Sequence, residues 1–133
     1  MASSKSAKKL KRLVLAQTVA ESMAKSQVGE LAANLTQQEE KLDQAREAFS
    51  NATTSLIFAD LHLRHIHGLA SQCVETRSQL ELARRGLQSE TVRNKKLKSR
   101  LKSTLVEELR DEESKLMMER LDRSSAKISS PGY

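Results

Sequence analysis

The chain has 133 residues, of which 30% are charged, 38% hydrophobic and only 2% aromatic, and its formal net charge is +6. So few large apolar residues cannot fill a thick globular core, although they can line the narrow seam between paired helices. Only four glycines and one proline interrupt the chain, which favours long helices. The composition therefore predicts an all-α protein and argues against a globular domain.

The first predicted helix covers about residues 8–50. From Val28 to Leu56 its ladder of mostly apolar residues alternates steps of three and four, which is the spacing of a coiled-coil seam. Between Ala16 and Val28 three consecutive steps of four occur, so we expect the seam to unwind locally there, as at a stutter. Residues 1–7 are small and polar and should fray.

Two segments could reverse the direction of the chain. Residues 50–55 have low helix propensity in a row. Residues 65–68 end in Gly68, which could cap a helix. Either segment would turn the chain into a hairpin of two antiparallel arms.

Charge favours the first segment. A hairpin centred near residue 58 places Arg77 beside Glu39 and sets the basic stretch Lys5–Arg12 beside acidic residues around Glu107, although each exposed ion pair contributes only about 0–1 kcal/mol. We therefore place the turn region at about residues 51–60. The reversal at Gly68 stays an alternative.

The second predicted helix covers about residues 61–123, and residues 124–133 should form a disordered tail. At 1.5 Å per residue this helix is roughly 95 Å long, against roughly 65 Å for the first. Its last turns, from about Glu112, should therefore project alone or meet another protein. We expect residues 1–133 to form one domain, a long antiparallel two-helix coiled-coil hairpin with frayed termini.

Side chains that could carry chemistry do not come together in the sequence. Cys73 is the single cysteine, so it cannot form an intramolecular disulfide, and it is expected in the seam. The histidines His62, His65 and His67 should be solvated, because a metal site needs three or four converging ligands. We therefore expect no enzymatic activity, no metal or other cofactor, and no small-molecule substrate.

The sequence also indicates a location. Its longest apolar run, Leu56–Ala59, is far shorter than the roughly 20 residues that a membrane-spanning helix needs. The N-terminus carries no secretory signal, and a lone cysteine fits a reducing compartment. We expect a cytoplasmic protein.

Basic residues gather in two stretches, Lys5–Arg12 and Arg93–Lys102, neither of which contains an acid. Clustered lysine and arginine can bind polyanions, but they can also form a solvated helix face or match an acidic protein. Aromatic side chains that could stack on bases are nearly absent. We therefore do not expect a nucleic-acid partner, although this interpretation stays open.

An apolar cluster lies at the predicted turn, where hairpins normally carry polar residues. The cluster consists of Leu56, Ile57, Phe58 and Leu61. Exposed apolar side chains at this end would form a docking surface. Alternatively, the segment folds back as a short helix and packs on Phe49 and Ile66.

The order of these segments resembles that of the FliJ family of bacterial flagellar export proteins and, more distantly, that of stalk proteins of virulence type III secretion. A basic start precedes a long first arm, and an apolar middle precedes the second arm, which ends in leucine and methionine. The similarity involves Lys8–Leu13, Gln37–Leu42, Leu56–Ile66, Gln79–Arg84 and Lys115–Asp122. It extends over nearly the whole chain.

The resemblance implies a non-enzymatic stalk and general chaperone. In such proteins the paired termini enter the pore of a hexameric export ATPase, the middle of the hairpin meets the cytoplasmic part of the export gate, and export chaperones also bind. The residues implied at the ATPase end are Leu10, Arg12, Leu13, Leu109 and Leu116. Those implied at the gate-facing tip are Phe49, Leu56, Phe58 and Leu61. The protein would then be held at the inner membrane through its partners.

Two other interpretations stay open. The chain could be a generic self-associating coiled-coil scaffold or adaptor, or a basic rod that binds nucleic acid. Within the resemblance, flagellar and injectisome-type export both fit.

Overall fold

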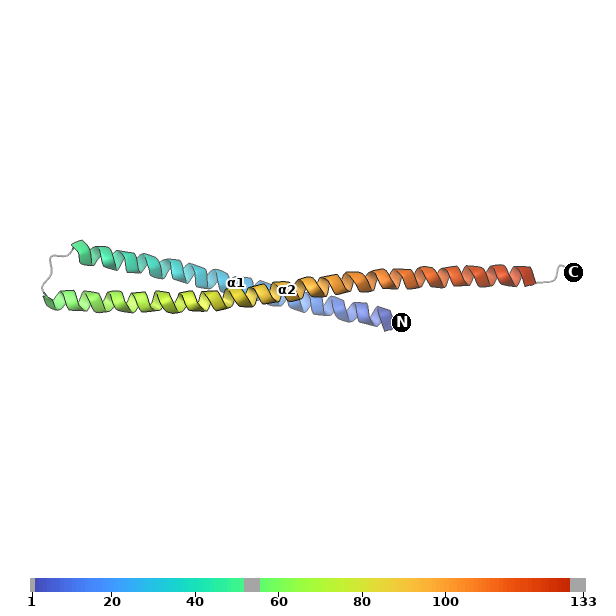
Figure 1. Cartoon of the computed structure of the whole chain (residues 1–133), viewed down its shortest axis with the longest axis horizontal. Coiled ribbons are helices and arrows are strands. Elements are labelled where there is room, and N and C mark those ends of the chain that lie inside the picture. The colour runs from blue at the N-terminus through green and yellow to red at the C-terminus, as the bar shows by residue number, and fades with distance from the viewer. Residues whose placement is uncertain (1, 52–55, 130–133) are drawn as a thin grey trace. The chain divides into compact units, whose positions relative to one another are not determined.

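The protein is all-α and consists of two long helices that pack against each other (Figure 1). Helix α1 comprises Ala2–Asn51, with 50 residues, and helix α2 comprises Leu56–Ser129, with 74 residues. The computed structural model describes residues 2–51 and 56–129, and the side chains of residues 5–51 and 58–126. The two-helix hairpin predicted from the sequence is confirmed.

Both helices are longer than the sequence predicted. Helix α1 begins at Ala2 rather than near residue 8, and α2 begins at Leu56 rather than near residue 61. At the other end α2 continues to Ser129, so the first six residues of the predicted disordered tail are helical. Residues 130–133 lie outside the described residues.

The predicted turn region overlaps the start of α2. Residues 52–55, which separate the two helices, lie outside the described residues. Gly68 lies inside α2, so the alternative reversal does not form. A glycine inside a helix costs only about 1 kcal/mol relative to alanine, and packing of the flanking turns can offset that cost.

The chain divides into two compact units. Unit 1 combines Met1–Thr18 with Arg93–Tyr133, and unit 2 comprises Val19–Val92. Each unit therefore contains a stretch of α1 and a stretch of α2.

In unit 2 the two helices run antiparallel. Arg77 on α2 donates a hydrogen bond from Nη2 to Oε1 of Glu39 on α1 at 2.9 Å. Thr91 on α2 donates from Oγ1 to Oε1 of Glu21 on α1 at 3.2 Å. Of these two contacts, the one nearer the N-terminus of α1 is also the one nearer the C-terminus of α2. The contact between Arg77 and Glu39 confirms the pairing predicted from charge.

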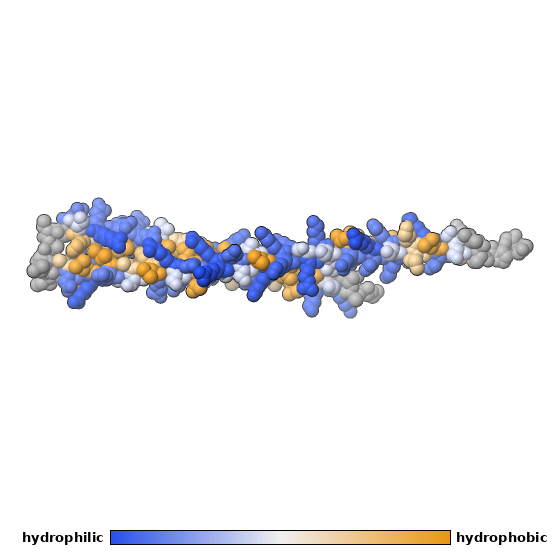
Figure 2. All heavy atoms as spheres, viewed as in Figure 1, coloured by the Kyte–Doolittle hydropathy of each residue, from blue (hydrophilic) through white to orange (hydrophobic). Residues whose placement is uncertain are grey.

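The seam of unit 2 buries a few side chains almost completely. Leu42 is 7% exposed, Cys73 2%, Thr76 7% and Leu80 4%. Cys73 is therefore a packed seam residue, as predicted, and its thiol is free of a disulfide. Figure 2 shows hydrophobic residues along the line where the helices of unit 2 meet, bordered by hydrophilic residues.

Helix α1 contains a series of seam positions along its whole length, and the predicted run of fours is also half-buried at Ala20, Ala24 and Val28, so the stutter stays a prediction. Buried and half-buried positions alternate steps of three and four along its length. The alternating series comprises Ala7, Leu10, Val14, Gln17, Glu21, Ala24, Val28, Leu31, Leu35, Gln38, Leu42, Ala45 and Phe49, and Ala20, Ala32 and Glu39 beside it are half-buried as well. Gln17 and Glu21 take seam positions, whereas Ala16 is exposed. The helical period fixes which face is buried, and here it places polar residues on that face.

Helix α2 shows the same alternation from Ala59 to Glu108. The positions are Ala59, His62, Ile66, Leu69, Cys73, Thr76, Leu80, Ala83, Leu87, Glu90, Asn94, Leu97, Leu101, Thr104 and Glu108. The apolar ladder predicted from the sequence matches these positions from Ile66 to Leu101. It differs at the N-terminal end, where His62 is half-buried and Phe58 and Leu61 are exposed. At the C-terminal end Thr104 and the predicted Leu105 are both half-buried, whereas the predicted Leu109 is exposed.

Unit 1 has a small buried core. Ala7 and Leu10 on α1 are buried, as is Asn94 on α2. Leu97 and Leu101 are half-buried beside them along α2. Burial on α2 ends at Glu108, and every described side chain from Leu109 to Ala126 is exposed.

Candidate interaction surfaces

The last turns of α2 form an exposed helical segment in unit 1, residues 109–126, which we call the terminal segment. Its apolar residues are Leu109, Leu116, Met117, Met118 and Leu121, each between 56% and 67% exposed. Figure 2 shows an apolar group near the C-terminal end of α2. The sequence prediction that turns from about Glu112 would lack an intramolecular partner agrees with this exposure.

Leu109 and Leu116 of the terminal segment do not continue the seam, whereas Met118 does. Extending the alternation past Glu108 leads to Asp111, Lys115, Met118 and Asp122. Three of these four are charged. Leu109 and Leu116 each follow such a position by one residue, which rotates them by about 100° around the helix. Leu109 and Leu116 therefore lie on a face of the terminal segment that differs from the face used by the hairpin.

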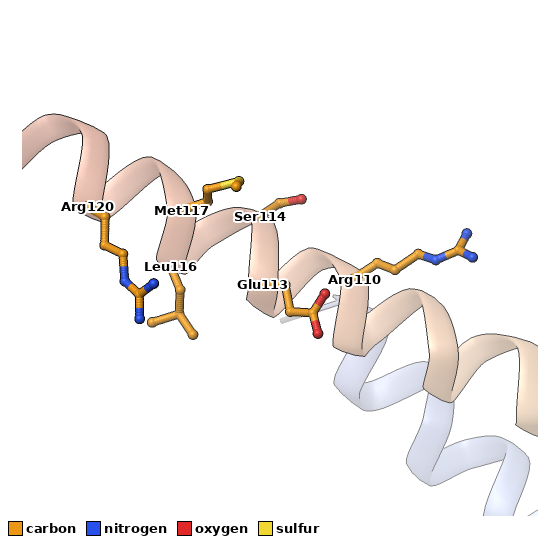
Figure 3. A pocket seen from close by; sticks show the side chains of 6 residues that line it. All are labelled: Arg110, Glu113, Ser114, Leu116, Met117 and Arg120. Carbon is orange, nitrogen blue, oxygen red and sulfur yellow. The ribbon is translucent and has the colours of Figure 1, made fainter.

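A shallow groove lies along this segment (Figure 3). Six residues of α2 line it: Arg110, Glu113, Ser114, Leu116, Met117 and Arg120. Figure 3 shows Leu116 and Arg120 extending from one side of the helix, and Met117 and Ser114 from the other. A groove on a single helix encloses no small molecule, since ligand pockets bury most of the ligand surface. It suits a protein surface better.

The other residues implied at the ATPase end differ from one another in exposure. Leu10 is buried at 9% exposure, so it packs within unit 1. Arg12 is exposed, and Leu13 is 45% exposed. Only Arg12 and Leu13 of the three α1 residues therefore offer much surface to a partner.

The residues implied at the gate-facing tip lie in unit 2. Phe58 and Leu61 are 57% and 54% exposed and line a shallow groove with His62 and His65. Phe49 is half-buried, with its ring centroid 6.2 Å from that of His62. The side chain of Leu56 lies outside the described residues. The exposure of Phe58 and Leu61 favours the docking surface over the alternative in which this segment packs inward.

Both basic stretches belong to unit 1. Among the described residues, ten of their side chains are exposed and make no ion pair. These are Lys5, Lys8, Lys9, Lys11, Arg12, Lys95, Lys96, Lys98, Arg100 and Lys102. The charge match expected between Lys5–Arg12 and the acids around Glu107 thus forms no ion pair there. The sequence showed both basic stretches. It did not show that they lie in one unit or that their charges are not paired with acidic side chains there.

The structure describes no cluster suited to metal chemistry. No three His, Cys, Asp or Glu side chains among the described residues are grouped so that they could hold a metal ion. Cys73 is buried in the seam of unit 2. Within the same residues, neither helix contains a stretch apolar enough to cross a membrane.

Comparison of the chain with models of known protein families, with curated proteins and with solved structures gave no significant match.

Proposed function

We propose that the chain is a non-enzymatic coiled-coil component of a flagellar type III protein export apparatus. In this role it acts as a stalk and general chaperone that couples a hexameric export ATPase to the export gate. The observation that carries the proposal is the terminal segment, a helix with an apolar face that the hairpin leaves uncovered. The resemblance of the segment order to FliJ proteins adds support.

The architecture suits a coupling role. An antiparallel pair of helices is stiff along its axis, because burying one face of each helix resists bending. Exposed apolar residues lie at the terminal segment in unit 1 and at Phe58 and Leu61 in unit 2. Two separate docking surfaces on one two-helix protein are what a connector between two partners needs.

Binding to the ATPase tests the proposal directly. The full chain should retain the hexameric export ATPase of the same organism, together with nucleotide, in a pull-down or by surface plasmon resonance. The double variant Leu109→Asp/Leu116→Asp should weaken this binding at least tenfold, because charges on the apolar face would have to be desolvated. Circular dichroism should show unchanged helix content, since both side chains are exposed.

A matched control uses two exposed apolar residues of unit 2. Val74 and Leu82 are 63% and 64% exposed, so Val74→Asp/Leu82→Asp introduces the same charges at similar exposure. This variant should bind the ATPase like the unmodified chain. Absence of ATPase binding, or an equal loss in both variants, would contradict the proposal.

The tip provides a second arm of the test. Phe58→Ala/Leu61→Ala should weaken binding to the cytoplasmic part of the export gate while leaving ATPase binding intact. The reverse pattern is expected for Leu109→Asp/Leu116→Asp. Loss of both partners in either variant would mean that the two surfaces are not separate.

The same terminal segment also favours the second candidate, a self-associating scaffold. An uncovered apolar helical face can pair with another copy of itself. Sedimentation equilibrium over a hundredfold concentration range distinguishes the two functions. A stalk that waits for an ATPase stays monomeric, whereas a scaffold forms a dimer that Leu109→Asp/Leu116→Asp abolishes.

A further inference from the structure

The ten exposed basic residues of the two basic stretches are distributed around both helices of unit 1, and five lysines share one flank. Lys8 and Lys11 on α1 each directly follow a seam position, Ala7 and Leu10. On α2, Lys95, Lys98 and Lys102 follow the seam positions Asn94, Leu97 and Leu101 in the same way.

Unit 2 shows what this placement means. Arg77 directly follows the seam residue Thr76, and Glu39 directly follows Gln38. These two side chains bond across the helix pair at 2.9 Å. Positions that follow seam residues on the two helices therefore share one flank of an antiparallel pair. By the same spacing, Lys8, Lys11, Lys95, Lys98 and Lys102 share one flank of unit 1, which we call the lysine flank.

The lysine flank is dense in charge and lacks acids. Lys95, Lys98 and Lys102 occupy two turns of α2, a length of roughly 10 Å. Lys8 and Lys11 form a second row on α1. Exposed leucines follow seam positions at both ends: Leu15, 68% exposed, and Leu109, 60% exposed. The nearest acid at an equivalent position, Glu112, comes ten residues after Lys102.

We propose that the lysine flank binds the surface of an anionic phospholipid bilayer directly. Lysine is a mobile point charge without the planar fork that lets arginine match one phosphate or carboxylate. A row of lysines therefore suits a fluid anionic surface that needs no fixed geometry. Exposed leucines beside such a row can enter the headgroup region. The inference is independent of the ATPase proposal.

Two other kinds of polyanion fit the flank less well. Nucleic-acid surfaces that bind without base readout combine basic grooves with aromatic stacking platforms, and unit 1 contains no described aromatic residue. A specific acidic protein interface depends on aromatic or arginine anchors in pockets. The lysine flank has neither.

The test is co-sedimentation of the full chain with vesicles. Vesicles of phosphatidylcholine containing 30% phosphatidylglycerol should bind the chain, and vesicles of phosphatidylcholine alone should not. Each lysine near an anionic leaflet contributes about a fivefold factor, so Lys8→Gln/Lys95→Gln/Lys102→Gln should weaken binding on the order of 100-fold. Raising the salt to about 1 M shortens the Debye length to about 3 Å and should release the chain.

Two control variants remove the same net charge elsewhere. Lys41→Gln/Arg46→Gln/Arg84→Gln in unit 2 should leave vesicle binding within about twofold. Lys9→Gln/Lys96→Gln/Arg100→Gln, at positions that precede seam residues in unit 1, should weaken it much less than the lysine-flank variant. Circular dichroism verifies that all three variants fold.

Three outcomes would overturn the proposal. One is equal binding to vesicles with and without phosphatidylglycerol. Another is an equal loss in the lysine-flank variant and either control, which would reduce the effect to overall charge. The third is tighter binding to a single-stranded oligonucleotide than to vesicles at equal phosphate concentration, which would assign the flank to nucleic acid.

Discussion

Leu80 and Leu116 are leucines of the same helix in opposite environments. Leu80 is 4% exposed in the seam of unit 2, and Leu116 is 56% exposed in the terminal segment of unit 1. Helix α2 has 74 residues and α1 has 50, so part of α2 has no counterpart on α1. The comparison teaches that a leucine stabilises this fold only where the other helix covers it, and elsewhere it is available to a partner.

Truncating each leucine measures this difference. Leu80→Ala should lower the free energy of unfolding by about 2–3 kcal/mol, from lost burial and the cavity left behind. Leu116→Ala should change it by less than about 0.5 kcal/mol, as at other exposed positions. Urea unfolding followed by circular dichroism checks both values. Similar effects of the two substitutions would mean that the terminal segment is packed within the free chain.

Leu10 sharpens the comparison, because the family resemblance implied that it lies at a partner surface, whereas the structure buries it. Leu10→Asp should destabilise unit 1 by about 1–2 kcal/mol through burial of an unpaired charge. The cost is limited because the few residues before it can unravel locally. Leu13→Asp is the control, since Leu13 is 45% exposed. Amide hydrogen exchange should accelerate around residue 10 only in the first variant, and equal acceleration in both would be inconsistent with seam burial.

The fold follows closely from the sequence because a helical period leaves few alternatives. Steps of three and four from Val28 onward, and the charges of Glu39 and Arg77, predicted the antiparallel pairing that the structure contains. The predicted list of seam residues was wrong at some apolar residues that do not fall on the three–four spacing. Gln17 and Glu21 keep the period and lie in the seam, whereas Ala16 keeps only apolarity and is exposed.

The interaction surfaces were less predictable, because they depend on where the partner helix ends. The sequence placed Leu109 and Leu116 on the same ladder as the seam leucines. Leu109 comes one residue after Glu108, and Leu116 one residue after Lys115, which continues the seam spacing. This offset distinguishes them from the seam leucines and is recognised only once the seam is known. Leu15 and the lysine flank could not be identified without knowing the seam either, because both are defined by their position relative to it.

Replacing a polar seam residue by an apolar one should change the free energy of unfolding by less than Leu80→Ala does, and in the opposite direction. Gln38 is half-buried, and its Oε1 atom is buried without a hydrogen-bond partner among the described residues. Gln38→Leu should therefore raise the free energy of unfolding by about 1 kcal/mol, because an uncompensated polar atom is replaced by an apolar one. Gln37→Leu, at an exposed neighbouring position, should have little effect. Thermal unfolding monitored by circular dichroism distinguishes them, and a lower Tm for Gln38→Leu would contradict this account.

Of the interactions tested, the ion pair between Arg77 and Glu39 should contribute least to the free energy of unfolding. Its side chains are 57% and 43% exposed, so water and salt screen the attraction, and a double-mutant cycle with Arg77→Gln and Glu39→Gln should give about 0.2–1 kcal/mol. In about 1 M salt the coupling should fall toward zero. The pair of Arg85 and Glu81, four residues apart on α2 at 2.7 Å, is the control because it joins no two helices. A coupling above about 2 kcal/mol for Arg77 and Glu39 would mean that this contact, rather than packing of buried seam residues such as Leu42 and Leu80, sets the register.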